Sequence, residues 1–227
     1  MQADGRTRDW LVFGLAAGLG FLFKQSALFL PVCLGIYFAL EPAARRHLRQ
    51  PGPWLALVHR DPCPDNVLFT EDGEAHLIDF EFSVSGHALL DAGYWHMGFP
   101  TCWCAGTVPD AVGTRLDRIY RDTIAHAVPQ AADDAAFQRE AAMMSMVQLF
   151  GSLEWLLQGA LKNDHEWGIS THRRRILHYL DTAIRKTTEA DILPGIRAIA
   201  KDWRNRLRDE WQPCQPLGLY PAFAEAK

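Results

Sequence analysis

The sequence predicts an α+β fold that is mostly helical, with one small β-hairpin, preceded by an apolar, membrane-like helical segment. Helical periodicity of apolar residues fills most of the chain after residue 110. Two short apolar runs flank an Asp-Gly turn near residue 73, which is typical of a hairpin. The stretch from Leu11 to Leu40 has 30 residues, and its only clearly polar side chains are Lys24, Gln25 and Ser26.

The apolar stretch is long enough to cross a bilayer, which needs about 20 apolar residues in a helix. A lysine at mid-depth costs a few kcal/mol. Two interpretations therefore stay open: a single span with Lys24 inside it, or two shorter helices with a break at residues 24–26. The basic cluster at residues 45–49 follows, and the positive-inside bias places the rest of the chain in the cytoplasm. We expect residues 11–40 to anchor the chain to the inner or plasma membrane.

Composition favours one globular domain after this leader. The chain has 227 residues, is 48% hydrophobic and carries a net charge of −4. We predict a leader with a basic linker over residues 1–56 and a domain over residues 57–227. The mild acidity argues against a nucleic-acid partner.

The five cysteines are odd in number and unevenly spaced. This pattern predicts reduced, cytoplasmic thiols and no disulfide framework. The Cys102-Trp103-Cys104 triplet lacks the second Cys/His pair that a tetrahedral metal site needs.

The predicted hairpin joins residues 67–69 to residues 76–78 through the turn at residues 70–74. A hairpin brings its two ends together. We therefore expect Asn66, just before the first strand, to lie beside Asp79, just after the second.

The residues around this hairpin have the spacing of a kinase catalytic loop. The chain reads His59-Arg60-Asp61-Pro62-Cys63-Pro64-Asp65-Asn66, and Asp79 follows thirteen residues later. Asp61 is the candidate base that accepts or orients the proton of an acceptor hydroxyl. Asn66 and Asp79 offer the oxygen ligands that Mg²⁺ prefers. His59, with Arg60, is expected to support the loop by hydrogen bonding.

The segments "VHRDPCPDNVLF" and "HLIDFEFSVSGHALLDAGYWHMGFPTCWC" resemble the aminoglycoside phosphotransferase and choline-kinase-like family, a branch of the protein-kinase-like fold. The resemblance covers about residues 57–227. It implies transfer of the γ-phosphoryl group of ATP, with Mg²⁺, to a hydroxyl of a small molecule. It makes Asp61 the catalytic base and Asn66 and Asp79 the Mg²⁺ ligands. Aminoglycoside, choline, homoserine, sugar and macrolide acceptors all occur in that family, so the acceptor stays open.

Two further positions match the family, and two depart from it. Gly86 and Asp91 match its later Gly-x4-Asp, whose Asp usually has a structural role. Arg60 replaces the commonest Gly, and Glu81 stands where protein kinases have Gly.

A kinase of this fold also has an N-terminal lobe with a glycine-rich loop and a strand lysine. Gly14, Gly18, Gly20 and Lys24 superficially suggest such a loop, but they lie in an unbroken apolar run. Lys24 also precedes Asp61 by only 37 residues, which is too few for the remaining lobe. We therefore expect the C-terminal lobe alone, with no assigned nucleotide-binding residue and little activity.

Residues 10–57 are similar to an internal stretch of polytopic membrane glycosyltransferases that use polyprenyl-phosphate sugars. The segments "GLAAGLGFLFKQSALFLPVCLGIYFAL" and "RRHLRQPGPWLAL" carry this resemblance, which marks no catalytic residue. Two alternatives to the phosphotransferase follow: a non-catalytic, membrane-tethered lobe that packs against a partner, or a fragment of a glycosyltransferase fusion.

The remaining helices are predicted from periodicity and capping. They cover residues 111–127, a long run from the Asp133-Asp134 cap to residue 161, residues 171–186 capped by Ser170, and residues 194–211. We expect Trp95, Met97, Phe99 and Trp103 to be core or pocket-wall residues.

Overall fold

The computed structural model describes residues 50–224. The chain divides into two units, residues 1–49 and residues 50–227. The predicted membrane segment at residues 11–40, the rejected glycine-lysine pattern within it and the basic cluster at residues 45–49 lie outside the described residues. The predicted boundary between residues 56 and 57 falls inside the first described strand.

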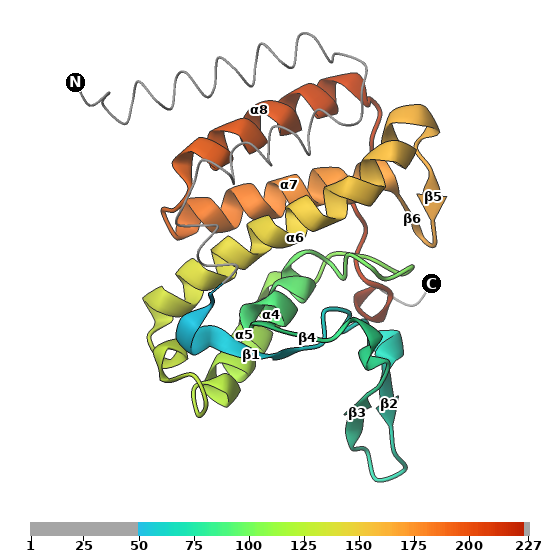
Figure 1. Ribbon diagram of the computed structural model, residues 1–227. Helices are drawn as coiled ribbons and strands as arrows, with labels where there is room; N and C mark the ends of the chain where they lie inside the picture. Colours follow the sequence, from blue (N-terminus) through green and yellow to red (C-terminus); the bar gives the residue numbers. More distant parts are fainter. Residues whose placement is uncertain (1–49, 225–227) are drawn as a thin grey trace, which may run out of the picture. The chain divides into compact units, whose positions relative to one another are not determined.

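The described part is a mostly helical α+β arrangement with small antiparallel sheets, as predicted (Figure 1). The strands are β1 (Leu55–Val58), β2 (Val67–Phe69), β3 (Ala75–Leu77), β4 (Val84–His87), β5 (Glu166–Trp167) and β6 (Ser170–Thr171). The α-helices are α4 (Leu89–His96), α5 (Asp110–Ile124), α6 (Asp134–Asn163), α7 (His172–Glu189) and α8 (Pro194–Glu210). The 3₁₀ turns are η1 (Gly52–Trp54), η2 (Pro64–Asn66), η3 (Phe80–Phe82), η4 (Pro129–Ala132) and η5 (Pro221–Phe223).

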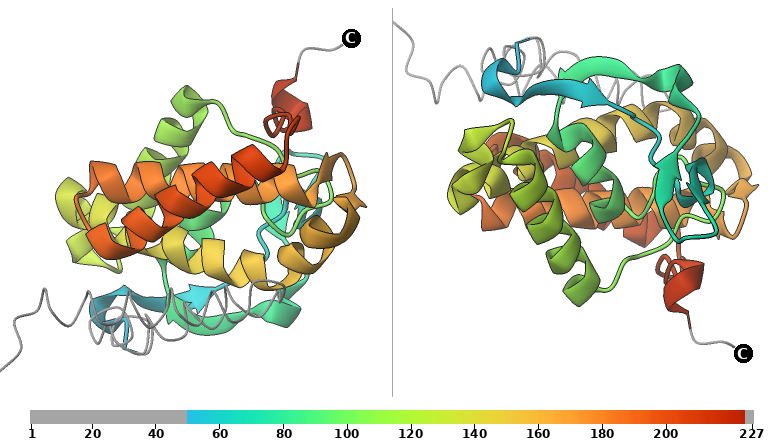
Figure 2. Two further views of the ribbon diagram at one scale, coloured as in Figure 1. Left: turned by 90° about the horizontal axis from the view of Figure 1, so that it is seen from above. Right: turned by 90° about the horizontal axis from the view of Figure 1, so that it is seen from below.

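Helix α6 is the centre of the helical body. It packs against α4 and α7, and α8 packs on α7, as Figures 1 and 2 show. A helix with neighbours on two sides needs apolar residues around most of its circumference. Accordingly Phe137, Met144, Leu149 and Leu156 are all fully buried. Among the helices that the structure describes, none combines the length and the apolar composition that crossing a bilayer requires.

The N-terminal cap was predicted correctly for α6 and wrongly for α7. The side chain of Asp133 accepts a hydrogen bond of 2.9 Å from the backbone nitrogen of Ala136, which confirms the predicted cap of α6. Helix α7 is capped by Thr171, whose hydroxyl accepts from the backbone nitrogen of Arg174. Ser170 is not the cap, because its hydroxyl instead accepts a hydrogen bond from Arg175.

The predicted hairpin is confirmed as β2 and β3, which pair antiparallel with Val67 opposite Leu77. Gly73 supplies the positive φ of 85° that the turn requires. Two further ladders were not predicted: β1 pairs with β4, and β5 pairs with β6. The first of these brings the residues on either side of the hairpin together, because β1 ends directly before His59 and β4 begins just after η3.

Large apolar side chains on β1–β4 and in η3 are exposed, and we call them the strand surface. Its members are Leu55, Leu57, Leu68, Phe69, Leu77, Phe80, Phe82 and Val84. Phe69 is 73% exposed and Leu57 is 71% exposed. Leu68 and Phe69 are consecutive in β2 and point to opposite faces of the hairpin, so the exposed residues do not all lie on one face. Residues 50–224 alone therefore leave this surface uncovered.

Candidate functional site

The candidate loop, residues 59–66, is fixed at its start by α4 and by the end of the hairpin. The carboxylate of Asp91, in the first turn of α4, accepts hydrogen bonds of 2.8 Å from the backbone nitrogens of both His59 and Arg60. The His59 ring lies 2.8 Å from the Ile78 carbonyl oxygen through Nε2 and packs against Phe80 at 4.7 Å. Arg60 has a left-handed φ of 68°, so the chain turns sharply just before Asp61.

Asp61 and Asn66 are in direct contact. The side-chain Nδ2 of Asn66 donates to the backbone carbonyl of Asp61 at 2.9 Å and to its carboxylate at 3.2 Å. Both contacts use the amide nitrogen, so the amide oxygen of Asn66 remains available to a ligand. The Asn66 carbonyl also accepts a hydrogen bond from the nitrogen of Ile78 at 2.9 Å, which holds this end of the loop beside the end of β3.

Two residues that the sequence did not single out also bind the Asp61 carboxylate. The Tyr94 hydroxyl donates to its Oδ1 at 2.6 Å, and the Thr101 hydroxyl donates to the same oxygen. Burial, together with the bond to Asp61, raises the pKa of Tyr94 above its ordinary value, so the phenol stays protonated as a donor. A signal existed for Tyr94: it follows Asp91 by three residues in α4, and this spacing puts both on one helix face.

Asp79 follows β3 by two positions and precedes η3 directly. Its backbone is left-handed, with φ 64° and ψ 57°, and its side chain is exposed. Because Ile78 bonds to Asn66, Asp79 is one residue beyond the partner of Asn66. The fold thus joins Asp61 to Asn66 directly and holds the residue before Asp79 against the backbone of Asn66.

The prediction that the cysteines are reduced is wrong for one pair. Cys63 and Cys102 are joined by a disulfide, with their Cα atoms 5.8 Å apart. They are 39 residues apart in sequence and meet only through the fold, so spacing gave no sign of the bond. Cys104 and Cys214 are free among the described cysteines.

Trp103, expected to be a core or pocket-wall residue, is 53% exposed and does not belong to the core. Its indole nitrogen donates to the exposed carboxylate of Asp65 at 3.1 Å, which keeps the ring at the surface. Met97, by contrast, is fully buried as expected.

Arg175 on α7 anchors the loop that carries Thr101 and Cys102. It is fully buried, and its guanidinium donates to the carbonyl of Cys102 at 2.8 Å and to that of Trp167 at 2.8 Å. Weaker bonds reach the carbonyls at positions 100 and 103. The guanidinium also stacks 4.3 Å from the Trp167 ring centroid. A buried arginine is stable here because carbonyl oxygens meet its donors.

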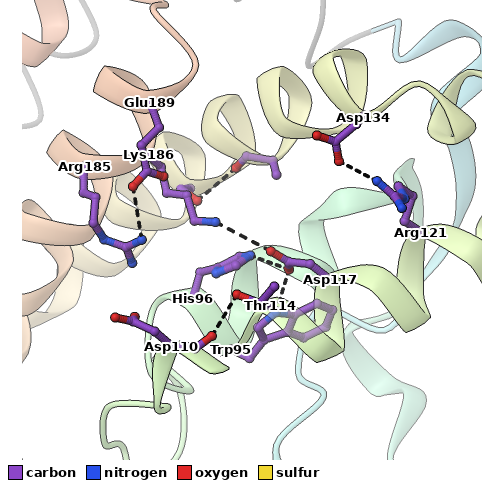
Figure 3. A network of polar contacts seen from close by, with 12 residues as sticks. Trp95, His96, Asp110, Thr114, Asp117, Arg121, Asp134, Arg185, Lys186 and Glu189 are labelled. Atoms are coloured by element: carbon purple, nitrogen blue, oxygen red, sulfur yellow. Dashed lines mark hydrogen bonds and ion pairs between the residues drawn. The ribbon is translucent and has the colours of Figure 1, made fainter. Parts of the chain in front are cut away.

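A second polar cluster lies between α4, α5 and α7 (Figure 3). Its centre is Asp117 on α5, whose carboxylate meets Trp95 Nε1 at 3.1 Å, His96 Nε2 at 2.7 Å and Lys186 Nζ at 3.7 Å. Burial lowers the pKa of His96 and of Lys186, partly offset by Asp117. Burial would raise the pKa of Asp117, but His96 and Lys186 outweigh it and hold that pKa below its ordinary value.

This cluster lines a pocket of about 650 Å³ that also includes His178. Burial lowers the pKa of His178 to about 4, and its Nε2 is buried without a hydrogen-bond partner. Aspartate and glutamate together are as numerous around the pocket as lysine and arginine together, so the formal charges of its lining cancel. The contacts of Asp117 connect α5 to α4 and α7, which is a structural role.

Residues 1–59 match the family described as dolichyl-phosphate-mannose-protein mannosyltransferase. The match covers 59 of the 227 residues and ends at His59, before Asp61, Asn66 and Asp79. It supports the predicted glycosyltransferase-like character of the N-terminal part, and with it an association with membranes. No curated protein matches the chain.

Proposed function

We propose that residues 50–224 contribute the catalytic-loop half of an ATP- and Mg²⁺-dependent phosphotransferase that acts on a hydroxyl of a small molecule. The contact between Asn66 Nδ2 and Asp61 carries the proposal. It holds a carboxylate and an amide oxygen in a fixed relation at the end of a hairpin that also carries Asp79. Phosphoryl transfer needs this kind of positioning more than it needs covalent chemistry.

The residues present fit a magnesium ion by the chemistry of their donors. Mg²⁺ takes hard oxygen ligands and keeps several waters, so one or two protein ligands suffice. The amide oxygen of Asn66 and the exposed carboxylate of Asp79 would hold it. Bound there, the ion would neutralise charge on the nucleotide phosphates.

Asp61 has a different task in the proposal. Its Oδ1 accepts from Tyr94 and Thr101, and its Oδ2 accepts from Asn66. A carboxylate has about four lone-pair sites, so Oδ2 can take one more donor. An acceptor hydroxyl there would be oriented by Asp61 and would pass its proton to it.

We infer that the chain has little turnover as it stands. The lysines among residues 50–224 are Lys162, Lys186 and Lys201, and all three lie on α-helices. No strand lysine of the described residues therefore reaches nucleotide phosphates. The exposed strand surface also implies a missing partner. Without a clamp on the nucleotide, the positioning that supplies most of the rate is lost.

ATP turnover tests the site and the inactivity together. The expected result is a rate near background for the full chain, with weak Mg-ATP binding in calorimetry that Asp79→Ala abolishes. Asp72→Ala is the matched control, because Asp72 is an exposed carboxylate in the same hairpin. Turnover that disappears in Asp61→Ala would overturn the inactivity and support the site. Absence of Mg-ATP binding in a chain with a folded circular-dichroism spectrum would contradict the proposal.

The second candidate is a non-catalytic lobe tethered to a membrane and packed against a partner. The match of residues 1–59 to a mannosyltransferase family and the exposed strand surface favour it. Under this candidate the chain is a junction between a glycosyltransferase segment and a phosphotransferase-like lobe in the cytoplasm. Sequencing the transcript across Leu57-Val58 tests the junction. A frame that breaks there would show that the two halves are not one protein.

A further inference from the structure

Cys63 lies inside the candidate catalytic loop, between Asp61 and Asn66, and its disulfide reaches Cys102. The Cα separation of 5.8 Å is in the ordinary range for a disulfide. Both cysteine side chains are buried. The proposed phosphoryl transfer has no use for this bond, so its place in the loop needs a separate explanation.

The sulfur of Cys63 has a partner in either redox state. Its Sγ lies 2.7 Å from Asp65 Oδ1, and only a thiol can donate that hydrogen bond. In the structure this sulfur is bonded to Cys102 and carries no hydrogen, so the hydrogen bond to Asp65 can form only after reduction. A reduced Cys63 thiol would therefore have an acceptor within reach.

The two segments joined by the disulfide are held by different contacts. On the Cys102 side, the buried Arg175 binds the backbone carbonyls of residues 100, 102 and 103. On the Cys63 side, residues 61–66 are held mainly by side-chain hydrogen bonds, such as those of Asn66 to Asp61. The disulfide thus ties the candidate loop to the segment that Arg175 anchors.

The bond also fixes what the Asp61 carboxylate contacts. Thr101 directly precedes Cys102 and donates its hydroxyl to Asp61 Oδ1. While the disulfide is closed, this hydroxyl stays on Oδ1 of the carboxylate whose Oδ2 an acceptor hydroxyl would approach. We propose that Cys63 and Cys102 are a thiol–disulfide modification site, whose oxidation holds Asp61 against Thr101 and whose reduction releases residues 61–66. The consequence for Asp61 as a base rests on the proposed function; the redox link itself does not.

The exchange balances with an external disulfide of low molecular weight, RSSR. The Cys63 and Cys102 thiols lose two protons and two electrons and form one S–S bond. RSSR accepts both through a mixed disulfide and leaves as two RSH. Reduction is the reverse reaction with two thiols.

A bound metal ion is the competing occupant of this site. The ligating atoms of Cys63, Asp65 and Cys102 lie within 4.8 Å of one another. Two thiolates and a carboxylate suit zinc, which would exclude the disulfide. The experiment has to separate these two outcomes.

The full chain is equilibrated with glutathione at varied ratios of oxidised to reduced form, quenched in acid, alkylated and mapped by mass spectrometry. As the glutathione becomes more oxidised, we expect alkylation of Cys63 and of Cys102 to fall together in one two-electron transition. Alkylation of Cys214 should not follow that transition. Independent labelling of the two, or labelling of both at every ratio, would overturn the proposal. So would reduced protein that retains stoichiometric zinc and resists oxidation until a chelator is added.

Hydrogen exchange without nucleotide measures the effect on the loop, so its outcome does not depend on the proposed function. Oxidation is expected to slow exchange of residues 61–66 by about tenfold, with no change in α8. The double variant Cys63→Ser/Cys102→Ser should lose this redox sensitivity, and Cys104→Ser, a buried free cysteine, should keep it. Equal exchange in both redox states, or faster exchange throughout α6–α8 on reduction, would show a bond without a local switching role.

Discussion

Arg175 donates its Nη1 hydrogen bond to the carbonyl of Cys102 at 2.8 Å, across 73 residues of sequence. This contact joins α7 to the loop that carries Thr101. It therefore holds in place the residue that donates a hydrogen bond to Asp61. The guanidinium is buried and serves several carbonyls at once, which a lysine ammonium cannot reproduce in the same plane.

Arg175→Lys should therefore lower the free energy of unfolding by about 2–4 kcal/mol. Chemical denaturation of the full chain measures this. The control is Arg206→Lys, whose side chain is 76% exposed, and whose change should stay within about 0.5 kcal/mol. Equal effects of the two substitutions would show that the carbonyl contacts of Arg175 contribute nothing.

Replacing glycine by alanine should have opposite effects on stability at two positions. Gly168 has a φ of +64°, and a Cβ there would overlap the Trp103 carbonyl oxygen. Gly168→Ala should cost at least about 2 kcal/mol of stability. Gly113 lies in α5 with nothing near its missing Cβ, so Gly113→Ala should stabilise by up to about 1 kcal/mol. Thermal unfolding of both variants checks the difference in sign; a neutral Gly168→Ala would contradict the packing of β5–β6 on Trp103.

Asp117→Asn removes the negative charge that faces His96 and Lys186. The buried ammonium of Lys186 then loses its counter-charge, and stability should fall by about 3 kcal/mol. Asp122→Asn is the control, because Asp122 is 66% exposed and pairs with Arg121 only at 3.7 Å. Denaturation midpoints at pH 7 provide the comparison. A tolerated Asp117→Asn would mean that the cluster in Figure 3 does not hold α5 against α7.

His178 gives the stability a pH dependence of defined sign. Burial lowers its pKa to about 4 in the folded state, against about 6.5 when unfolded. Between these values the unfolded chain binds more protons, so stability falls as the pH drops from 6.5 towards 4, by up to about 3 kcal/mol for this group. His178→Gln should flatten that slope, and His126→Gln, at an exposed position, should not. If His178→Gln left the pH dependence of the unfolding free energy unchanged, another group would be responsible for it.

Local sequence signals predicted much of the fold. The Asp-Gly turn predicted the β2–β3 hairpin, and Asp133 predicted the start of α6, because both act through neighbouring residues. The pairing of β1 with β4 escaped prediction, since Leu55 and His87 meet across 32 residues. The core position considered for Trp103 is excluded, and its indole bonds to Asp65, a partner distant in sequence.

The parts of the candidate site that could be predicted are those whose residues lie close together in sequence or are joined by the hairpin. The contact of Asp61 with Asn66 lies within one short loop. Thr101 and the Cys63–Cys102 bond depend on the fold of residues between them. The buried position of Arg175 could have been inferred, because it shares a helix face with Tyr179, which is also fully buried. Arg175 follows two other arginines, and such a run of charge is typical of an exposed helix face.

The most direct test of the central claim is binding of Mn²⁺, a paramagnetic substitute for Mg²⁺, followed by electron paramagnetic resonance with the full chain and ATP. We expect bound Mn²⁺ in the presence of ATP that is lost in Asp79→Asn and weakened about tenfold or more in Asn66→Ala, while Asp72→Asn binds as the unaltered chain does. Equal Mn²⁺ binding in all four proteins would contradict the convergence of Asn66 and Asp79 on one divalent ion.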